Sequence, residues 1–264
     1  MRVAVVTGAN KGIGFAIVKT LALNLDNGLI YLTARNEELG QKAVADLCSS
    51  TPNRKSEIKF HQLDISDNAS ISNFRQFLVD THGGLDILVN NAGFAYKASA
   101  TEPFSQQAAD SVAINYTATL NLCKALLPIL RSHARVVNVS SEVGMLSIVK
   151  SDTLQQKFLS DTLSLDELDA IMNDFVKSSK DGSHVSKGFP NSAYGMSKVG
   201  VTAMTRVLQR LLDADGSRSD IVVSSCCPGY VATDMSSHKG FKTPDQGMFY
   251  VGRLSLVDLQ FRFV

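Results

Sequence analysis

"RVAVVTGANKGIG", residues 2–14, joins an apolar run to a glycine-rich turn. The apolar side chains around and after this turn recur every fourth position, which predicts a helix: Ile13, Ile17, Leu21 and Leu25. A strand that passes through a tight glycine turn into a helix is the first unit of a nucleotide-binding α/β sheet. The stretch therefore predicts the fold class.

The same alternation continues along the chain. Five more apolar runs predict strands, at residues 29–34, 58–64, 85–93, 134–141 and 220–229, and helical periodicity separates them. Continuous apolar strands that alternate with helices indicate a parallel sheet covered on both faces. We expect one α/β domain over residues 1–264, a Rossmann-type, doubly wound parallel sheet.

Residues 147–190 interrupt this alternation, because they are far longer than an ordinary connection between a strand and a helix. Within them "LQQKFL" and "LDELDAIMNDFVKS" have helical periodicity. The second segment has an apolar face made of Leu165, Leu168, Ile171, Met172 and Phe175. We expect a helical insert ahead of the next long helix.

Composition limits the function classes. The 264 residues are 44% hydrophobic and 19% charged with a net charge of +1, which does not favour a nucleic-acid partner. No apolar run approaches the ~18 residues of a membrane span, and no leader precedes the first strand, so we expect a cytoplasmic protein without a membrane partner. Four cysteines and five histidines show no ligand spacing, so we expect no metal.

The glycine turn predicts a phosphate site. Gly8, Gly12 and Gly14 allow backbone N–H groups to approach a pyrophosphate, and the helix N-terminus beyond them favours negative charge. Asn10, Lys11 and Ile13 complete the turn and are expected to contact the same cofactor.

The end of the second strand predicts which dinucleotide binds. A free ribose 2′-OH usually meets Asp or Glu about 20 residues beyond the glycines. Here Arg35 stands in that place, and Lys11 adds a second cation. Glu37 and Glu38 more plausibly open the next helix. Two cations favour a 2′-phosphate, so we expect NADP(H).

"SAYGMSK" places Tyr194 and Lys198 four residues apart, on one face of a helix. Such pairs are common on helices, so this spacing alone does not indicate chemistry. Together with six other motifs, however, it resembles the short-chain dehydrogenase/reductase family. The motifs in family order are TGANKGIG, LD at 63–64, NNAG at 90–93, the region of Asn115, NVSS at 138–141, YGMSK at 194–198 and PGYVATD at 228–234. The long insert before the tyrosine resembles the cytosolic, NADPH-dependent carbonyl reductase branch of that family.

This resemblance implies roles at the matching positions. Ser141 would bind the substrate carbonyl, Tyr194 would be the general acid or base, and Lys198 would hold the nicotinamide ribose. Asn115 would hold a water in the proton path, and Ser140 would face the sheet. The remaining cofactor contacts implied are Asp64 and Ile65 at the adenine, Asn91, Ala92 and Gly93 along the central wall, and Pro228, Gly229, Val231 and Thr233 at the nicotinamide amide.

The Tyr194 and Lys198 pair also has a physical rationale. Moving a tyrosine proton near neutrality costs ~4 kcal/mol, since its ordinary pKa is ~10. An ammonium ~4 Å away offers up to ~4 kcal/mol at an effective dielectric of ~20. We therefore expect Lys198 to lower the pKa of Tyr194, which would act as an acid in reduction and a base in oxidation.

Three functions remain open at this point. The branch resemblance implies reduction of ketones, quinones or aldehydes as small-molecule substrates. The alternatives are alcohol oxidation of a hydroxysteroid or prostaglandin type, and a low-activity, truncated product that only binds nucleotide. The residues Phe94, Tyr96, Met145, Phe189 and Tyr230 would line an apolar mouth, although core packing explains them nearly as well. We expect a monomer, because the insert should cover part of the surface through which many relatives assemble.

The C-terminal part, 243–264, departs from the family pattern. Thr243 and Pro244 can begin a helix as N-cap and first residue. The segment "RLSLVDLQFRFV" lacks the usual glycine lead-in to a last strand, although alternation at Leu259, Phe261 and Phe263 allows a short edge strand. We expect the last ~15 residues to be poorly docked, with ~±4 residues of uncertainty in the boundary.

Overall fold

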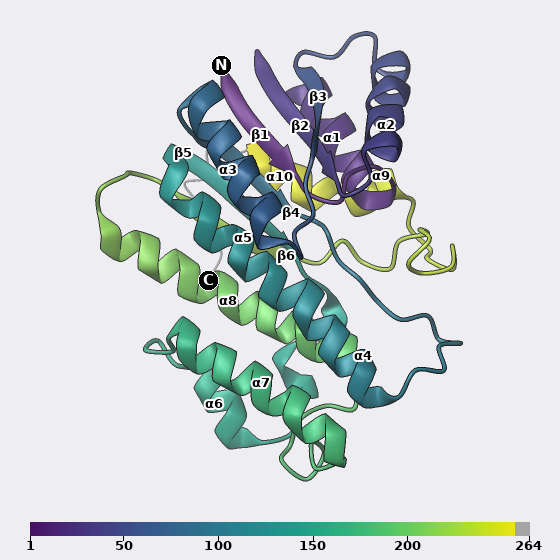
Figure 1. Ribbon diagram of the computed structural model, residues 1–264, viewed down its shortest axis with the longest axis vertical. Coiled ribbons are helices and arrows are strands. Elements are labelled where there is room, and N and C mark those ends of the chain that lie inside the picture. The colour runs from purple at the N-terminus through teal and green to yellow at the C-terminus, as the bar shows by residue number, and fades with distance from the viewer. Residues whose placement is uncertain (257–264) are drawn as a thin grey trace.

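Six parallel strands form one sheet in the order β3-β2-β1-β4-β5-β6 (Figure 1). The structure is a computed structural model that describes residues 1–256. The strands are β1 (Arg2–Val6), β2 (Gly28–Ala34), β3 (Glu57–Gln62), β4 (Leu85–Asn90), β5 (Leu130–Val139) and β6 (Val222–Cys226). The six expected strands and their parallel arrangement are confirmed.

The strand order reverses beside β1. The chain moves outward from β1 to β3 and then returns to place β4 on the other side of β1, with Val6 opposite Val89. In a doubly wound sheet, ligands bind in the crevice at this reversal, outside the carboxyl ends of the strands. Most of the predicted site residues lie at or near these carboxyl ends.

Helices cover both faces of the sheet, as expected. One face carries α1 (Gly12–Asn24), α2 (Glu37–Ser50), α9 (Pro244–Gly247) and α10 (Phe249–Leu256). The other carries α3 (Asn68–His82), α4 (Phe104–Ser111), the π-helical turn η1 (Val112–Ala118), α5 (Thr119–Leu126) and α8 (Ala193–Asp215). Short 3₁₀ turns are η2 (Leu127–Ile129), η3 (Glu142–Gly144) and η4 (Leu146–Ile148).

Alternate residues of each central strand enter different cores. Val3 and Val5 of β1 pack with one face, and Ala4 and Val6 pack with the other. All four are at most 1% exposed. This two-sided burial explains why the strand reads as a continuous apolar run.

The insert is helical, as expected. It contains α6 (Asp152–Leu159) and α7 (Leu165–Asp181), which lie beyond α8 at the end of the molecule away from β1 and β2 (Figure 1). The predicted apolar face of α7 is buried, with Leu168 and Phe175 fully enclosed. This face packs against α4 and α8, so the insert joins the core of the domain.

The expectation of poor docking at the C-terminus is wrong for residues 250–256. Thr243 caps α9 and Pro244 is its first residue, as predicted. The next segment forms α10, in which Val251 and Ser255 are fully buried against the sheet. Residues four apart share one face of a helix, so this segment needs only one apolar face. The predicted edge strand, residues 259–263, lies outside the described residues.

Within the part of the chain that the structure describes, no helix is both long and apolar enough to cross a membrane.

Candidate active site

The glycine turn between β1 and α1 has the backbone shape that a phosphate site needs. Gly8 and Gly12 have φ angles of 59° and 60°, which only glycine adopts without strain. The N-cap of α1, Lys11, makes no side-chain cap hydrogen bond, and the first turn contains no acidic residue. The N–H groups of this turn therefore present positive potential to an anion. Asn10 and Ile13 are half-buried within the turn.

Two cations lie at this end, but one is engaged. Lys11 Nζ lies 2.6 Å from Asp234 Oδ2, on the loop that follows β6. Arg35 is exposed at the tip of β2. Of the two cations predicted to meet a 2′-phosphate, Arg35 is thus exposed, whereas Lys11 is paired with a carboxylate that lies 223 residues away in sequence.

The side chains predicted to flank the adenine lie at the end of β3. Ile65 is buried and Asp64 is half-buried. Hydrogen bonds from Ser66 lower the pKa of Asp64, and the nearby charge of Arg35 lowers it further. Asp64 and Arg35 are therefore neighbours at the edge where the second and third strands end.

The central wall is held to the glycine turn by the Asn91 side chain. Its Nδ2 donates to the carbonyls of Thr7 at 2.9 Å and Gly8 at 3.1 Å. The Ala92 N–H donates to Thr7 Oγ1 at 2.9 Å. At Gly93 an added Cβ would lie 3.3 Å from Asn115 Oδ1 and 3.7 Å from Lys198 Nζ. This wall therefore runs from the phosphate turn to the predicted catalytic residues.

The loop after β6 borders the predicted cofactor site on the side opposite the central wall. An added Cβ at Gly12 would lie 3.3 Å from Thr233 Cγ2, so Thr233 stands over the glycine turn. Within this loop, Pro228 and Val231 are buried. Gly229 has a φ of 81° and turns the chain between them. The four residues predicted at the nicotinamide amide thus belong to one structured segment.

Ser141 and Tyr194 come together because η3 and α8 approach closely. An added Cβ at Gly144 would lie 2.5 Å from Lys198 Cβ, and one at Gly195 would lie 2.7 Å from the Val143 carbonyl. Ser141 lies close enough to the Tyr194 phenol for its hydroxyl to act to lower the pKa of Tyr194. The two glycines were not singled out from the sequence, because nothing local marks such a close contact.

The Ser140 hydroxyl contacts α8, whereas the family resemblance implied that Ser140 would face the sheet. Its hydroxyl lies 2.8 Å from Thr202 Oγ1 and 3.3 Å from the Lys198 carbonyl, within the protein. Ser140 is buried, whereas Ser141 is half-exposed.

Lys198 is buried beside Tyr194. Its Nζ lies 5.7 Å from the centre of the Tyr194 ring and donates to the Val139 carbonyl at 2.7 Å. Burial lowers the pKa of Lys198 from its ordinary value of 10.5 to about 8. The charge therefore sits next to the phenol at a desolvation cost.

The expected effect of Lys198 on Tyr194 is corrected by this geometry. Burial raises the pKa of Tyr194 from 10.0 to about 12, more than the Ser141 hydrogen bond lowers it. The reason is that the phenolate would be enclosed at this position, and burial penalises the charged form. At neutral pH the phenol is protonated.

Cys227, a cysteine without a predicted role, is a further neighbour of Tyr194 and Lys198. Its sulfur accepts N–H hydrogen bonds from Glu142 at 3.1 Å and Gly229 at 3.2 Å. It lies near enough for its charge to raise the pKa of both Tyr194 and Lys198. The position directly before the PGYVATD motif was the available signal.

Asn115 lies within the π-helical turn and is 1% exposed. Its Oδ1 accepts from the Phe94 N–H at 2.7 Å. Its Nδ2 donates to the Phe94 carbonyl at 2.8 Å and to Ser197 Oγ at 2.9 Å. Asn115 therefore joins the loop after β4 to the residue that precedes Lys198.

A family model described as short chain dehydrogenase matches residues 2–151 and 177–243. Those two stretches contain the glycine turn, Ser141, Tyr194 and Lys198.

The chain belongs to the short-chain dehydrogenase family.

Three proteins to which the chain is similar are reductases. Carbonyl reductase (NADPH) 1 of Mus musculus is 46% identical over 246 residues, which cover 93% of this chain and 87% of that protein. Carbonyl reductase (NADPH) 3 of Rattus norvegicus is 45% identical over 247 residues, with coverage of 93% and 87%. The structure of salutaridine reductase from Papaver somniferum has a TM-score of 0.86 at 32% identity, covering 97% of this chain and 96% of that one.

The short-chain dehydrogenase model does not match residues 152–176. These residues hold α6 and the larger part of α7. Most of the insert therefore lies outside the family model, as do residues 244–264.

The residues predicted to form an apolar mouth separate into two groups. The Phe94 and Tyr96 rings are in edge contact, with centres 4.9 Å apart, and the Met145 and Tyr230 side chains are exposed. Phe189 is 2% exposed and packs on Phe175, 5.6 Å away, so it belongs to the core of the insert. Its expected place in the mouth is therefore corrected.

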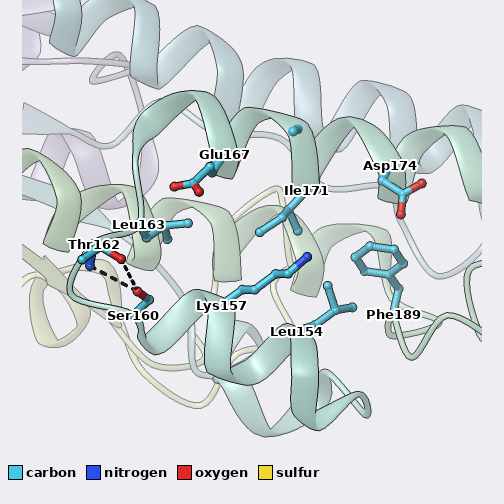
Figure 2. Close-up of a pocket in the computed structure, with 10 residues that line it drawn as sticks. Leu154, Lys157, Ser160, Thr162, Leu163, Glu167, Ile171, Asp174 and Phe189 are labelled. Atoms are coloured by element: carbon cyan, nitrogen blue, oxygen red, sulfur yellow. Dashed lines mark hydrogen bonds between the residues drawn. The ribbon is translucent and has the colours of Figure 1, made fainter.

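A cavity of about 330 Å³ lies between α6 and α7, away from the glycine turn. Figure 2 shows the Lys157 side chain running from α6 beneath Ile171, with Leu154 and Phe189 near its ammonium end. Its carboxylates are engaged by the protein: Asp174 pairs with Lys187 at 2.6 Å, and Glu167 accepts from Ser164 at 2.8 Å. The cavity contains none of the family's catalytic side chains.

Among residues 1–256, no three side chains of His, Cys, Asp or Glu are grouped so that they could hold a metal ion.

Proposed function

We propose that this protein is an NADPH-dependent carbonyl reductase that transfers hydride to ketones, quinones or aldehydes to give alcohols. The observation that carries the proposal is that Ser141 and Tyr194, both half-buried, lie close together beside Lys198 and next to the central wall. The carbonyl reductases that are similar over 93% of the chain support the same activity and cofactor.

The residues at the predicted cofactor site suit NADPH. The uncapped N-terminus of α1 suits a pyrophosphate, and Arg35 suits a 2′-phosphate. Asn91, Ala92 and Gly93 would line the middle of the dinucleotide, and Thr233 would cover it from the opposite side. Bound NADPH would supply the hydride.

Tyr194 and Ser141 would act on the substrate oxygen. The Ser141 hydroxyl would donate a hydrogen bond to the carbonyl oxygen and stabilise the negative charge that develops there. The Tyr194 phenol, whose pKa of about 12 keeps it protonated at neutral pH, would donate the proton that completes the alcohol. Lys198 would hold ribose hydroxyls and provide positive charge beside the phenol.

The protonation state of Tyr194 favours reduction over oxidation. A general acid must carry its proton before the reaction, whereas a base must first lose it. Alcohol oxidation would therefore require additional positive charge at the site. The raised pKa of Tyr194 keeps the proton donor that reduction needs in place at neutral pH.

We also propose a cytoplasmic monomer that acts on small molecules. All four cysteines are free thiols, as is usual in a reducing compartment. The insert packs α7 against α4 and α8, so those helices are partly covered.

A substrate panel tests the activity. Quinones, diketones, aldehydes and steroid ketones would each be incubated with NADPH, and loss of NADPH absorbance would be followed. Steroid alcohols with NADP⁺ provide the reverse direction. Turnover of quinones or diketones is expected to exceed alcohol oxidation; the opposite ranking would favour the dehydrogenase, and no turnover in either direction would contradict the proposal.

A further inference from the structure

The π-helical turn η1 contains both Asn115 and Tyr116. A π-turn inside a helix is rare, occurs often at functional sites and has less favourable packing than the α-helix around it. Successive side chains leave a helix in different directions, so the two residues contact different parts of the protein. Asn115 faces Phe94 and Ser197, whereas Tyr116 faces the insert.

The Tyr116 side chain is enclosed between α7 and α8. It is 1% exposed, and its hydroxyl donates to Asp169 Oδ1 of α7 at 2.7 Å. An added Cβ at Gly200 would lie 2.8 Å from Met172 Cε and 3.0 Å from the Tyr116 ring, so α7, α8 and η1 meet at this point. The other oxygen of Asp169 lies 3.7 Å from Lys124, on α5.

The Tyr116 phenol keeps its proton, so its hydrogen bond to Asp169 does not change with pH near neutrality. Burial raises the pKa of Tyr116 far above its ordinary value, and the bond to Asp169 raises it further. The phenol therefore remains a donor at every pH at which the protein is folded. Tyr116 can hold the π-turn in place but cannot exchange protons for the reaction.

We propose that Tyr116 and Asp169 are positioning residues for the active site, an inference that rests on the proposed function. Their hydrogen bond attaches the π-turn to the insert and thereby fixes the rotation of Asn115. Asn115 in turn holds Phe94 at the mouth and Ser197 beside Lys198. The insert, through Asp169, thus contributes to catalysis without contacting substrate or cofactor.

Tyr116→Phe tests this directly, since it removes one hydroxyl and retains the ring. We expect kcat to fall about 10-fold, since small misplacements of catalytic groups are costly, while the NADPH Kd stays within about two-fold. Asp169→Ala should match it, and the double variant should be no slower than either single one, because both remove one interaction. Asp169→Asn keeps an acceptor oxygen and should retain most of the activity. Asp166→Asn, at an exposed position of the same helix, is the matched control.

Amide exchange supplies a readout that does not depend on turnover. The Phe94 N–H donates to Asn115 Oδ1, so its hydrogen exchange reports the position of Asn115. We expect faster Phe94 exchange in Tyr116→Phe and Asp169→Ala, and wild-type exchange in Asp169→Asn and Asp166→Asn.

A lowered melting temperature with wild-type kcat and wild-type Phe94 exchange would overturn the proposal and leave Tyr116 a stability contact only. If the wild type reduced no carbonyl, the proposed function would fail, and the Phe94 exchange would still decide whether the hydrogen bond positions Asn115.

Discussion

The Lys198 ammonium lies 5.7 Å from the centre of the Tyr194 ring and gives its hydrogen bond to the Val139 carbonyl. The charge is thus held inside the protein, next to the phenol. Burial of both groups separates their pKa values, to about 8 for Lys198 and about 12 for Tyr194. This arrangement suits a proton donor, and it leads to the first prediction.

Tyr194→Phe should lower turnover at least ~100-fold, because it removes the proton donor. The NADPH Kd, measured by fluorescence titration, should change little, since the ring remains. Lys198→Ala should impair both quantities. Reduction of quinones by Tyr194→Phe at the wild-type rate would show that the acid has been misassigned.

Arg35→Asp should weaken NADPH binding by about 2–3 kcal/mol, or roughly 30- to 150-fold, because a carboxylate replaces the cation facing the 2′-phosphate. NADH lacks that phosphate, so its Kd should change less or improve. Lys177→Asp, an exposed charge reversal on α7, is the control. Equal losses for both cofactors would indicate a structural role for Arg35.

Lys198→Met should reveal the cost of the buried ammonium through the pH dependence of stability. Below pH 8 Lys198 is protonated in the folded and unfolded chain, and its desolvation penalty is fully present. Between pH 8 and 10.5 the unfolded chain binds more protons, so the stability of the wild type rises.

The wild type should therefore gain roughly 3 kcal/mol relative to Lys198→Met across this window, at about 1.4 kcal/mol per pH unit. Urea unfolding at several pH values measures the difference. Tyr194 is present in both proteins, so its own titration cancels. A difference that stays constant with pH would mean that the ammonium keeps its proton.

Val251→Asp should lower the free energy of unfolding by at least ~3 kcal/mol, because it places a charge without a partner in a fully buried position. Arg253→Ala, on the exposed side of α10, should cost less than ~1 kcal/mol. Equal effects in urea unfolding would show that α10 is not docked in solution.

Light scattering should give the mass of one chain. Phe175 and Met172 of α7 bury their side chains against the domain, and α7 covers part of α4 and α8. A stable tetramer would contradict the prediction, whereas a concentration-dependent dimer of low affinity would not.

Local pattern was enough to predict most of the fold. The apolar runs gave all six strands, and the periodicity of α7 gave its buried face. Thr243 and Pro244 were recognisable because capping depends on a few adjacent residues. The docking of α10 was missed, since the choice between a strand and a one-sided helix depends on the surface available for packing.

The candidate site was harder to predict from the sequence where it depends on contacts between residues that are far apart in the chain. The Lys11–Asp234 pair joins residues 223 positions apart, and no local pattern indicates it. The raised pKa of Tyr194 depends on how deeply α8 buries it, which spacing does not reveal. The same holds for Asp169, an ordinary acidic residue in the sequence of α7.

The contact between Tyr116 and Asp169 limits how this scaffold can be recombined. A chimera that replaced residues 152–176 with a shorter loop would remove the acceptor of a phenol that solvent does not reach. A replacement that kept the phenol buried without an acceptor would cost about 1–3 kcal/mol, so the graft would be penalised even if it closed without strain. Successful transplants should therefore either bring an acceptor of their own or carry phenylalanine at position 116.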